Sequence, residues 1–287
     1  MRRLRTIGTP MLKCGRIRYT NDLPIFAAFD ERVIEYPGTL HEDVPTSLNR
    51  MLLAGELDLA PISAFAWARN ADRLALLPDL CIGARDEVVS VVLVSQTPPA
   101  LLENTQIFVT QESASGRNLL RVLLERRYCI APSYVEDERP IERARRGFPA
   151  LLIGDAAIDA LEEFPRSQVY DLGTLWHEWT GQQTVFAVWA ARREIVDERR
   201  EEVRACMDAL TDALTWSKRN MPIVIAAAQQ RFKRAPGFYE DYYEKLNFTF
   251  HAAARSGLAA YCRELHAIGA IPQIPLVAPE VTDALAG

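Results

Sequence analysis

The 287-residue sequence has no run of about 18 or more apolar residues, so it predicts no membrane-spanning helix. Its basic start, MRRLRTIGTPMLKCG, is not followed by the apolar segment that a secretory signal peptide requires. We therefore expect a cytoplasmic protein that has no membrane partner.

Cysteine and histidine, the residue types most used in metal and redox sites, are scarce. The sequence has five cysteines and four histidines. No CxxC pair and no HxH or HExxH spacing occurs, so neither a metal site nor a redox dithiol is predicted. The P-loop, the dinucleotide signature GxGxxG and the nucleophile signature GxSxG are also missing. We expect no metal and no cofactor.

An excess of positive charge is missing as well. The formal net charge is −5, whereas nucleic-acid-binding domains are usually basic, so no nucleic-acid partner is predicted. Apolar residues make up 49% and charged residues 25%, as in ordinary globular proteins, and the length suits one or two domains.

What the sequence does have is a regular alternation of strand and helix patterns. Several of the apolar runs are long enough to be strands that helices cover on both faces. Residues 195–267 read as almost entirely helical, with an apolar face at four- and three-residue spacing. The expected strands are 15–19, 33–36, 57–62, 88–96, 106–110, 150–154, 168–173 and 185–191.

The two long apolar strands 88–96 and 185–191 bracket the middle of the chain. If both cross between lobes, residues 1–94 and 188–287 form one lobe and residues 95–187 form the other. The sequence thus predicts an α/β fold of two lobes, each a mixed, mostly parallel sheet flanked by helices, with a helical C-terminal region. A cleft between lobes is a common place for a ligand.

Three strand-to-helix turns carry polar residues at the edge where ligands bind in such sheets. They are Tyr19-Thr20-Asn21, the segment TQESASG at 110–116, and Gly154-Asp155. A helix that starts near Ser113 offers free N–H groups and a dipole that suit an anion. Ser113, Asn21 and Asp155 could equally be helix caps, and both interpretations stay open at this point.

Taken together and in order, several segments resemble the chorismate dehydratases of the futalosine route to menaquinone. The resemblance spans roughly residues 15–250, and IGDAA and the YDLG…EWTG…VFAVW stretch are its most specific parts. The segments are RIRYTNDLP (16–24), NRMLLAGELDLAPIS (49–63), SVVLVSQTP (90–98), TQESASGRNLL (110–120), LLIGDAAI (151–158), YDLGTLWHEWTGQQTVFAVWAARRE (170–194) and NFTF (247–250).

The resemblance implies the fold of type II periplasmic binding proteins, as a monomer or homodimer. It implies a hydro-lyase that converts chorismate to 3-[(1-carboxyvinyl)oxy]benzoate. The alternatives are the sister enzyme, 1,4-dihydroxy-6-naphthoate synthase, and a non-catalytic protein that binds small anions with the same fold. The sister enzyme usually starts with a Ser-Pro-Cys-Pro-Asn-Asp-like segment and uses a histidine in its middle region. Here Arg18-Tyr19-Thr20-Asn21 stands at the start, and no histidine lies between His41 and His177.

Chorismate is a dianion, so the resemblance implies a site of N–H groups and hydroxyls. The residues expected to be catalytic are Asn21, Ser90 and Asp155, and those expected to bind substrate are Tyr19, Ser63, Ser113, Ala114, Ser115, Gly116 and Gly154. The base that removes the proton is either Asp155 or the substrate's own carboxylate. Thr20 and Gln182-Gln183 depart from the family pattern. If these departures have an effect, we expect it on the closure of the two lobes.

Overall fold

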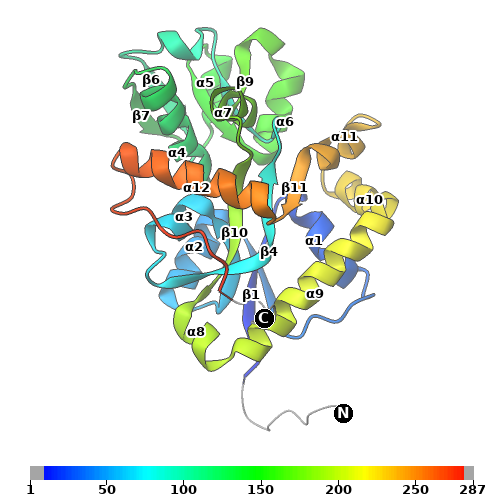
Figure 1. The fold of residues 1–287 in the computed structure, drawn as a ribbon. Coiled ribbons are helices and arrows are strands. Elements are labelled where there is room, and N and C mark those ends of the chain that lie inside the picture. The colour runs from blue at the N-terminus through cyan, green and yellow to red at the C-terminus, as the bar shows by residue number, and fades with distance from the viewer. Residues whose placement is uncertain (1–9, 281–287) are drawn as a thin grey trace, which may run out of the picture.

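The computed structural model describes residues 10–280 and shows two β-sheets with helices packed around them (Figure 1). The strand order is β11-β4-β10-β3-β1-β2 in the first sheet and β7-β6-β8-β5-β9 in the second. The strands of the first sheet are β1 Lys13–Ile17, β2 Thr39–Asp43, β3 Leu59–Ser63, β4 Leu74–Ala84, β10 Thr184–Arg192 and β11 Leu246–Thr249. Those of the second are β5 Val91–Val94, β6 Gln106–Val109, β7 Ser133–Glu136, β8 Ala150–Ile153 and β9 Val169–Asp171.

Both sheets are mixed in the same way. In the first, β1 pairs in parallel with β2 and β3, while β10 runs antiparallel to β3 and β4. In the second, β6 pairs in parallel with β7 and β8, while β5 runs antiparallel to β8 and β9. Most strands of each sheet therefore point one way. The strands that follow a passage between sheets, β5 and β10, point against them, and so does β11 at the edge of the first sheet.

The chain passes between the sheets twice, in residues 85–90 and 181–183. The expected strand 88–96 is shorter in the structure and lies wholly in the second sheet, because the chain has already crossed when β5 begins at Val91. The strand expected at 185–191 is β10 of the first sheet. The division into lobes at residues 94 and 187 stays a prediction.

Twelve α-helices among residues 10–280 surround the sheets (Figure 1). The helical C-terminal region expected from the sequence begins with α8 and continues to α12. The helices are α1 Leu23–Asp30, α2 Pro45–Ala54, α3 Ala64–Arg69, α4 Ala114–Val122, α5 Pro140–Arg145, α6 Gly154–Glu163, α7 Leu172–Thr180, α8 Arg193–Glu198, α9 Arg200–Arg219, α10 Met221–Arg231, α11 Phe238–Lys245 and α12 Ala252–Ala267.

The strand expected at residues 33–36 is wrong, and the true strand is β2. The backbone N–H groups of Val33 and Ile34 both bond to the carbonyl of Ala28, so these residues close the C-terminal end of α1. Tyr36 then packs edge-on against Phe29, with ring centroids 5.4 Å apart. The β-branched and aromatic residues here serve packing rather than sheet pairing.

Within residues 10–280, no helix has both the length and the apolar character needed to cross a bilayer. The described helices instead bury apolar side chains against the sheets and against one another. Their packing brings the ends of several strands from both sheets to one cavity.

Candidate active site between the two sheets

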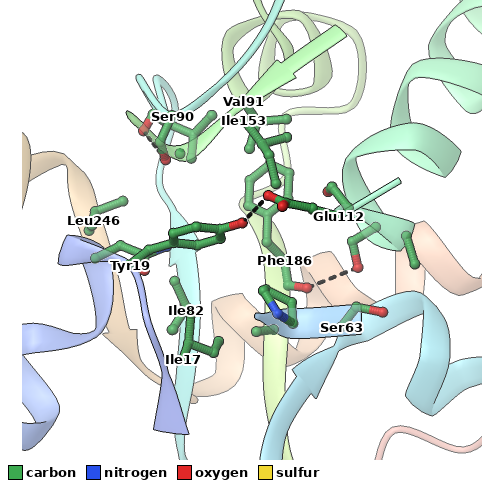
Figure 2. A pocket seen from close by; sticks show the side chains of 18 residues that line it. Ile17, Tyr19, Ser63, Ile82, Ser90, Val91, Glu112, Ile153, Phe186 and Leu246 are labelled. Atoms are coloured by element: carbon green, nitrogen blue, oxygen red, sulfur yellow. Dashed lines mark hydrogen bonds between the residues drawn. The ribbon is translucent and has the colours of Figure 1, made fainter. Parts of the chain in front are cut away.

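A pocket lies where the carboxyl ends of strands from both sheets meet (Figure 2). Its empty volume is about 650 Å³ when open solvent at its mouth is included. The described residues that line it are Ile17, Tyr19, Asn21, Pro45, Ser63, Ile82, Val88, Ser90, Val91, Glu112, Ser113, Ala114, Ser115, Ile153, Gly154, Phe186, Ala187 and Leu246.

Eight of the ten predicted site residues line this pocket, although they come from distant parts of the chain. The two that do not are Gly116 and Asp155. The eight are Tyr19, Asn21, Ser63, Ser90, Ser113, Ala114, Ser115 and Gly154. The pairing of strands explains the convergence, because β1, β3, β6 and β8 all end at this cavity and β5 begins there.

Ser63 and Ser113 each cap a helix and also face the pocket. The Ser63 hydroxyl accepts a hydrogen bond from the N–H of Ala66 at 3.0 Å, at the start of α3. The Ser113 hydroxyl accepts one from the N–H of Gly116 at 3.0 Å, at the start of α4. A hydroxyl that accepts such a bond keeps its own proton to donate, so the capping and ligand-binding roles are compatible.

Ser115 connects the two halves of the molecule. Its hydroxyl accepts a hydrogen bond from the N–H of Phe65 at 3.1 Å and donates one to the carbonyl of Phe186 at 2.9 Å. Phe65 lies in α3 and Phe186 in β10, whereas Ser115 lies in α4 beside the second sheet. Because its hydroxyl already donates and accepts, Ser115 shapes the pocket more than it offers free hydrogen-bonding capacity.

Asn21 and Ser90 offer the pocket freer polar groups. Asn21 lies in a short 3₁₀ turn, and its side chain caps neither that turn nor α1. Its Oδ1 atom is buried and has no hydrogen-bond partner. The Ser90 hydroxyl makes a long bond of 3.3 Å to the carbonyl of Val88 and also interacts with the side chain of Tyr242. Buried polar atoms normally find partners, so these two are suited to a ligand.

Gly116 lies behind Ser113 and not at the pocket surface. Its N–H is occupied by the Ser113 cap, and a Cβ atom at this position would come within 2.7 Å of the Ser113 hydroxyl oxygen. It would also approach a methyl group of Val91 to 3.1 Å. The glycine is therefore explained by close packing at the start of α4, and the N–H that was expected to hold a carboxylate holds the serine.

Gly154 is needed for its backbone conformation. Its φ is +57°, a left-handed value that glycine adopts without strain, and its N–H donates to the carbonyl of Ser90 at 2.8 Å. The ring of Tyr19 lies 3.7 Å from where a Cβ atom would stand. The turn from β8 into α6 thus places backbone directly against one wall of the pocket.

Asp155 neither caps α6 nor lines the pocket. Ile153 occupies the cap position without a side-chain hydrogen bond. Oδ1 of Asp155 instead lies 3.5 Å from the guanidinium of Arg234, an ion pair too long for a good hydrogen bond. Burial raises the pKa of Asp155, and the charge of Arg234 opposes that rise. No sequence pattern indicates this partner, which follows α10 far along the chain.

Arg234 bridges the C-terminal helices to α6. Its side chain is 8% exposed, and it also pairs with Asp159, one turn further along α6. Oε1 of Glu162 lies 4.0 Å from the same guanidinium. Arg234 therefore fixes the first turns of the helix that Gly154 starts.

Glu112 lines the pocket but is not among the predicted site residues. The hydroxyl of Tyr19 donates a hydrogen bond to its Oε2 atom at 2.5 Å, and Figure 2 shows this bond crossing the cavity. Burial is the main cause of the raised pKa of Tyr19, and the Glu112 carboxylate adds to it. Glu112 is the one charged residue of the segment TQES, which could have singled it out.

Apolar side chains make most of the remaining surface. Figure 2 shows Ile17, Ile82 and Phe186 at the base of the cavity and Val91 and Ile153 opposite Tyr19. They look like ordinary core residues of strands, so nothing in the sequence distinguishes them. Within residues 10–280, no cluster of three or more His, Cys, Asp or Glu residues could hold a metal ion.

Comparisons with known proteins identify the family of the chain. Residues 12–267 match the family model described as menaquinone biosynthesis. A chorismate dehydratase of Thermus thermophilus is 32% identical over 281 residues, which cover 93% of this chain and 98% of the relative. The 1,4-dihydroxy-6-naphthoate synthase of the same organism is 30% identical over 188 residues, covering 64% of this chain and 67% of the relative.

Solved structures show the same fold. The alkanesulfonate-binding protein of Xanthomonas axonopodis pv. citri, solved with bound MOPS, superposes with a TM-score of 0.68 and 19% identity, covering 95% of this chain and 98% of the other. The two-sheet architecture is thus that of periplasmic binding proteins, as the resemblance implied. With a family model matched along nearly the whole chain, the protein belongs to the menaquinone biosynthesis family.

Proposed function

We propose that this protein is a hydro-lyase that converts chorismate to 3-[(1-carboxyvinyl)oxy]benzoate and water, a step toward menaquinone by the futalosine route. The observation that carries the proposal is the match to the chorismate dehydratase of Thermus thermophilus over 93% of this chain and 98% of the relative. The shorter match to the naphthoate synthase makes that activity the weaker candidate.

The pocket suits the two ends of this substrate. Chorismate has two carboxylates, a ring hydroxyl and an apolar ring. The hydroxyl groups of Ser63 and Ser113 are placed to donate to a carboxylate, and the aliphatic side chains of Ile17 and Ile82 offer a surface for the ring. No positively charged side chain is among the described lining residues, so binding depends on neutral donors.

Dehydration removes a ring proton and the neighbouring hydroxyl, and the product is aromatic. The protein has to hold the hydroxyl and stabilise the negative charge that develops when the proton leaves. Asn21 and Ser90 are our candidates for these roles, because both line the pocket. The Oδ1 atom of Asn21 has no protein partner, and the bond from the Ser90 hydroxyl to Val88 is long.

The position of Asp155 argues against its role as the base. Its carboxylate is paired with Arg234 outside the pocket lining. Substrate assistance, in which a carboxylate of chorismate takes the proton, is therefore our preferred version. The Asp155→Asn variant should then keep most of its turnover, whereas Ser90→Ala should lose about 100-fold or more.

The test is to mix purified protein with chorismate and to follow ultraviolet absorbance and the masses of the products. A catalytically formed product lighter by one water supports the proposal. Chorismate that binds unchanged would show a binding protein instead. Chorismate that neither binds nor reacts would favour a different substrate, and the naphthoate synthase reaction would be assayed next.

A further inference from the structure

The backbone just before Ser90 has a conformation that is rare for its residue type. Val89 has a φ of +68°, in the left-handed region, where a β-branched side chain is strained. The N–H of Ser90 donates to the carbonyl of Val88 at 2.7 Å, so residues 88–90 form a tight turn. Such strain persists only where the surroundings enforce it, and it gathers at functional sites. The turn therefore calls for a functional explanation.

Asp171, the residue just before α7, enforces this conformation. Its Oδ2 atom accepts a hydrogen bond from the N–H of Val89 at 2.6 Å, and its two oxygen atoms share the N–H of Val88 at 3.1 and 3.2 Å. Burial raises the pKa of Asp171 to about 6, and these bonds oppose the rise, so the group is a carboxylate at about pH 8. A charged acceptor makes stronger hydrogen bonds than a neutral one, which offsets the strain at Val89.

Gly173, in the first turn of α7, lets the helix come close enough for these bonds. A Cβ atom at this position would stand 2.3 Å from the carbonyl oxygen of Asp86 and 3.1 Å from the backbone nitrogen of Val88. Both atoms belong to the first passage between the sheets, residues 85–90. A larger residue at position 173 would therefore push the passage away from α7.

The other side of the turn faces the pocket. Val88 and Ser90 are lining residues, whereas Asp171 is not among the described ones. The carbonyl of Ser90 accepts a hydrogen bond from the N–H of Gly154 at 2.8 Å, which joins the turn to the start of α6. Ser90 is buried, so its side chain has little room to move independently of the backbone. The place of its hydroxyl group therefore depends on the conformation of the turn.

We propose that Asp171 is a positioning residue for the dehydration, because it holds Val89 in the left-handed conformation that places the Ser90 hydroxyl at the pocket. The inference rests on the proposed function, in which Ser90 contacts the substrate. Asp171 also caps α7 by accepting from the N–H of Thr174 at 3.0 Å, so the test has to separate the two roles.

Asp171→Ser separates the cap from the turn. Serine is a preferred N-cap, and its single oxygen, one bond closer to the backbone, can bond to Thr174 and leave the passage without its acceptor. We expect kcat for chorismate at about pH 8 to fall about 10–100-fold, with KM within about twofold, because Ser90 acts on the transition state. Gly181→Ala, at the other end of α7 with a φ of +67°, is the control that should lose stability but keep kcat.

A second substitution tests whether Asp171 acts through the conformation of Val89. Glycine adopts positive φ without strain, so Val89→Gly should raise kcat several-fold in the Asp171→Ser protein. It should not restore stability, because it also removes a buried side chain. A purely structural role of Asp171 would not separate kcat from the free energy of unfolding in this way. Gly173→Ala, which displaces the passage, should lower kcat as well and replaces Asp171→Ser if that variant does not fold.

A double-mutant cycle tests whether the effect passes through Ser90. In a Ser90→Ala background, Asp171→Ser should lower kcat by less than about twofold, because the group that it positions is gone. Losses that multiply, an unchanged kcat in Asp171→Ser, or no recovery with Val89→Gly would each overturn the inference while the wild type still dehydrates chorismate. If a folded wild type forms no product from chorismate, the proposed function is wrong and the inference falls with it.

Discussion

The Oδ2 atom of Asp171 accepts a hydrogen bond from the N–H of Val89 at 2.6 Å, which ties the start of α7 to the first passage between the sheets. The same carboxylate accepts bonds from the N–H groups of Val88 and Thr174. Val89 has a φ of +68°, a left-handed value that costs energy for a β-branched residue. The side chain of Asp171 therefore holds both the start of α7 and the strained backbone of the first passage between the sheets.

Replacing Asp171 by Asn should lower the free energy of unfolding by about 1–3 kcal/mol, because the amide offers one acceptor oxygen for N–H groups that now share two. Urea denaturation measures the change. Asp72→Asn, at an exposed position, is the matched control and should alter stability by less than about 0.5 kcal/mol. Equal effects of the two substitutions would show that the crossing does not depend on Asp171.

Asp22 predicts a pH dependence of stability. Burial raises its pKa from 3.8 to about 8, and the nearby charge of Arg16 opposes the rise. Its Oδ2 atom accepts from the N–H of Ile17 at 2.8 Å, while Oδ1 has no partner. The folded state therefore holds a proton at this carboxyl group that the unfolded chain has released.

Because the pKa is raised on folding, the stability that Asp22 contributes is fully present below about pH 4 and is lost as the pH rises toward about 8. The loss should be at most about 1.4 kcal/mol for each pH unit in this window. Asp22→Asn should lack this component. Urea denaturation of both proteins at several pH values tests it, and parallel curves would contradict the prediction.

Gly154→Ala should separate backbone strain from effects on the pocket. The φ of Gly154 is +57°, and Gly181, at the end of α7, has a φ of +67° with no atom within 4 Å of an added Cβ. Alanine at either position should cost about 1–2 kcal/mol of stability. The kcat/KM for chorismate should fall in Gly154→Ala alone, because that turn forms the pocket wall. Equal activity in the two variants would count against the proposed site.

Ser115→Ala should destabilise the protein more than Ser113→Ala. The first leaves the N–H of Phe65 and the carbonyl of Phe186 without their buried partner, at about 1–3 kcal/mol. The second loses a helix cap worth about 1 kcal/mol. Thermal and urea unfolding of both variants should rank them in this order, and the reverse order would mean that the bonds of Ser115 to α3 and β10 contribute little to stability.

The parts of the fold that could be predicted are those with a strong local pattern. The all-apolar runs of β5 and β10 and the capping serine of α3 are of this kind. Residues 33–36 have strand-like composition, but the N–H groups of Val33 and Ile34 bond to the carbonyl of Ala28 at the end of α1. Composition alone does not reveal this bonding.

Some residues of the candidate site could likewise be predicted from the sequence, and others could not. Polar residues at strand ends, such as Asn21 and Ser90, could be found because the direction of the strands brings them together. The partner of Asp155 could not, since Arg234 lies 79 residues away and no spacing rule connects them. Glu112 was passed over because a carboxylate is not what an anion site is expected to contain.

Helix α12 contacts both α3, which follows a strand of the first sheet, and α4, which follows a strand of the second. Moving the sheets apart on this side would expose buried side chains such as Leu258 and Leu265 to water. On the side where α11 lies near α6, the ion pairs of Arg234 with Asp155 and Asp159 join the C-terminal helices to α6 (Figure 1). The side that α12 covers is therefore the costlier one to open, and we expect a ligand to reach the pocket from another side.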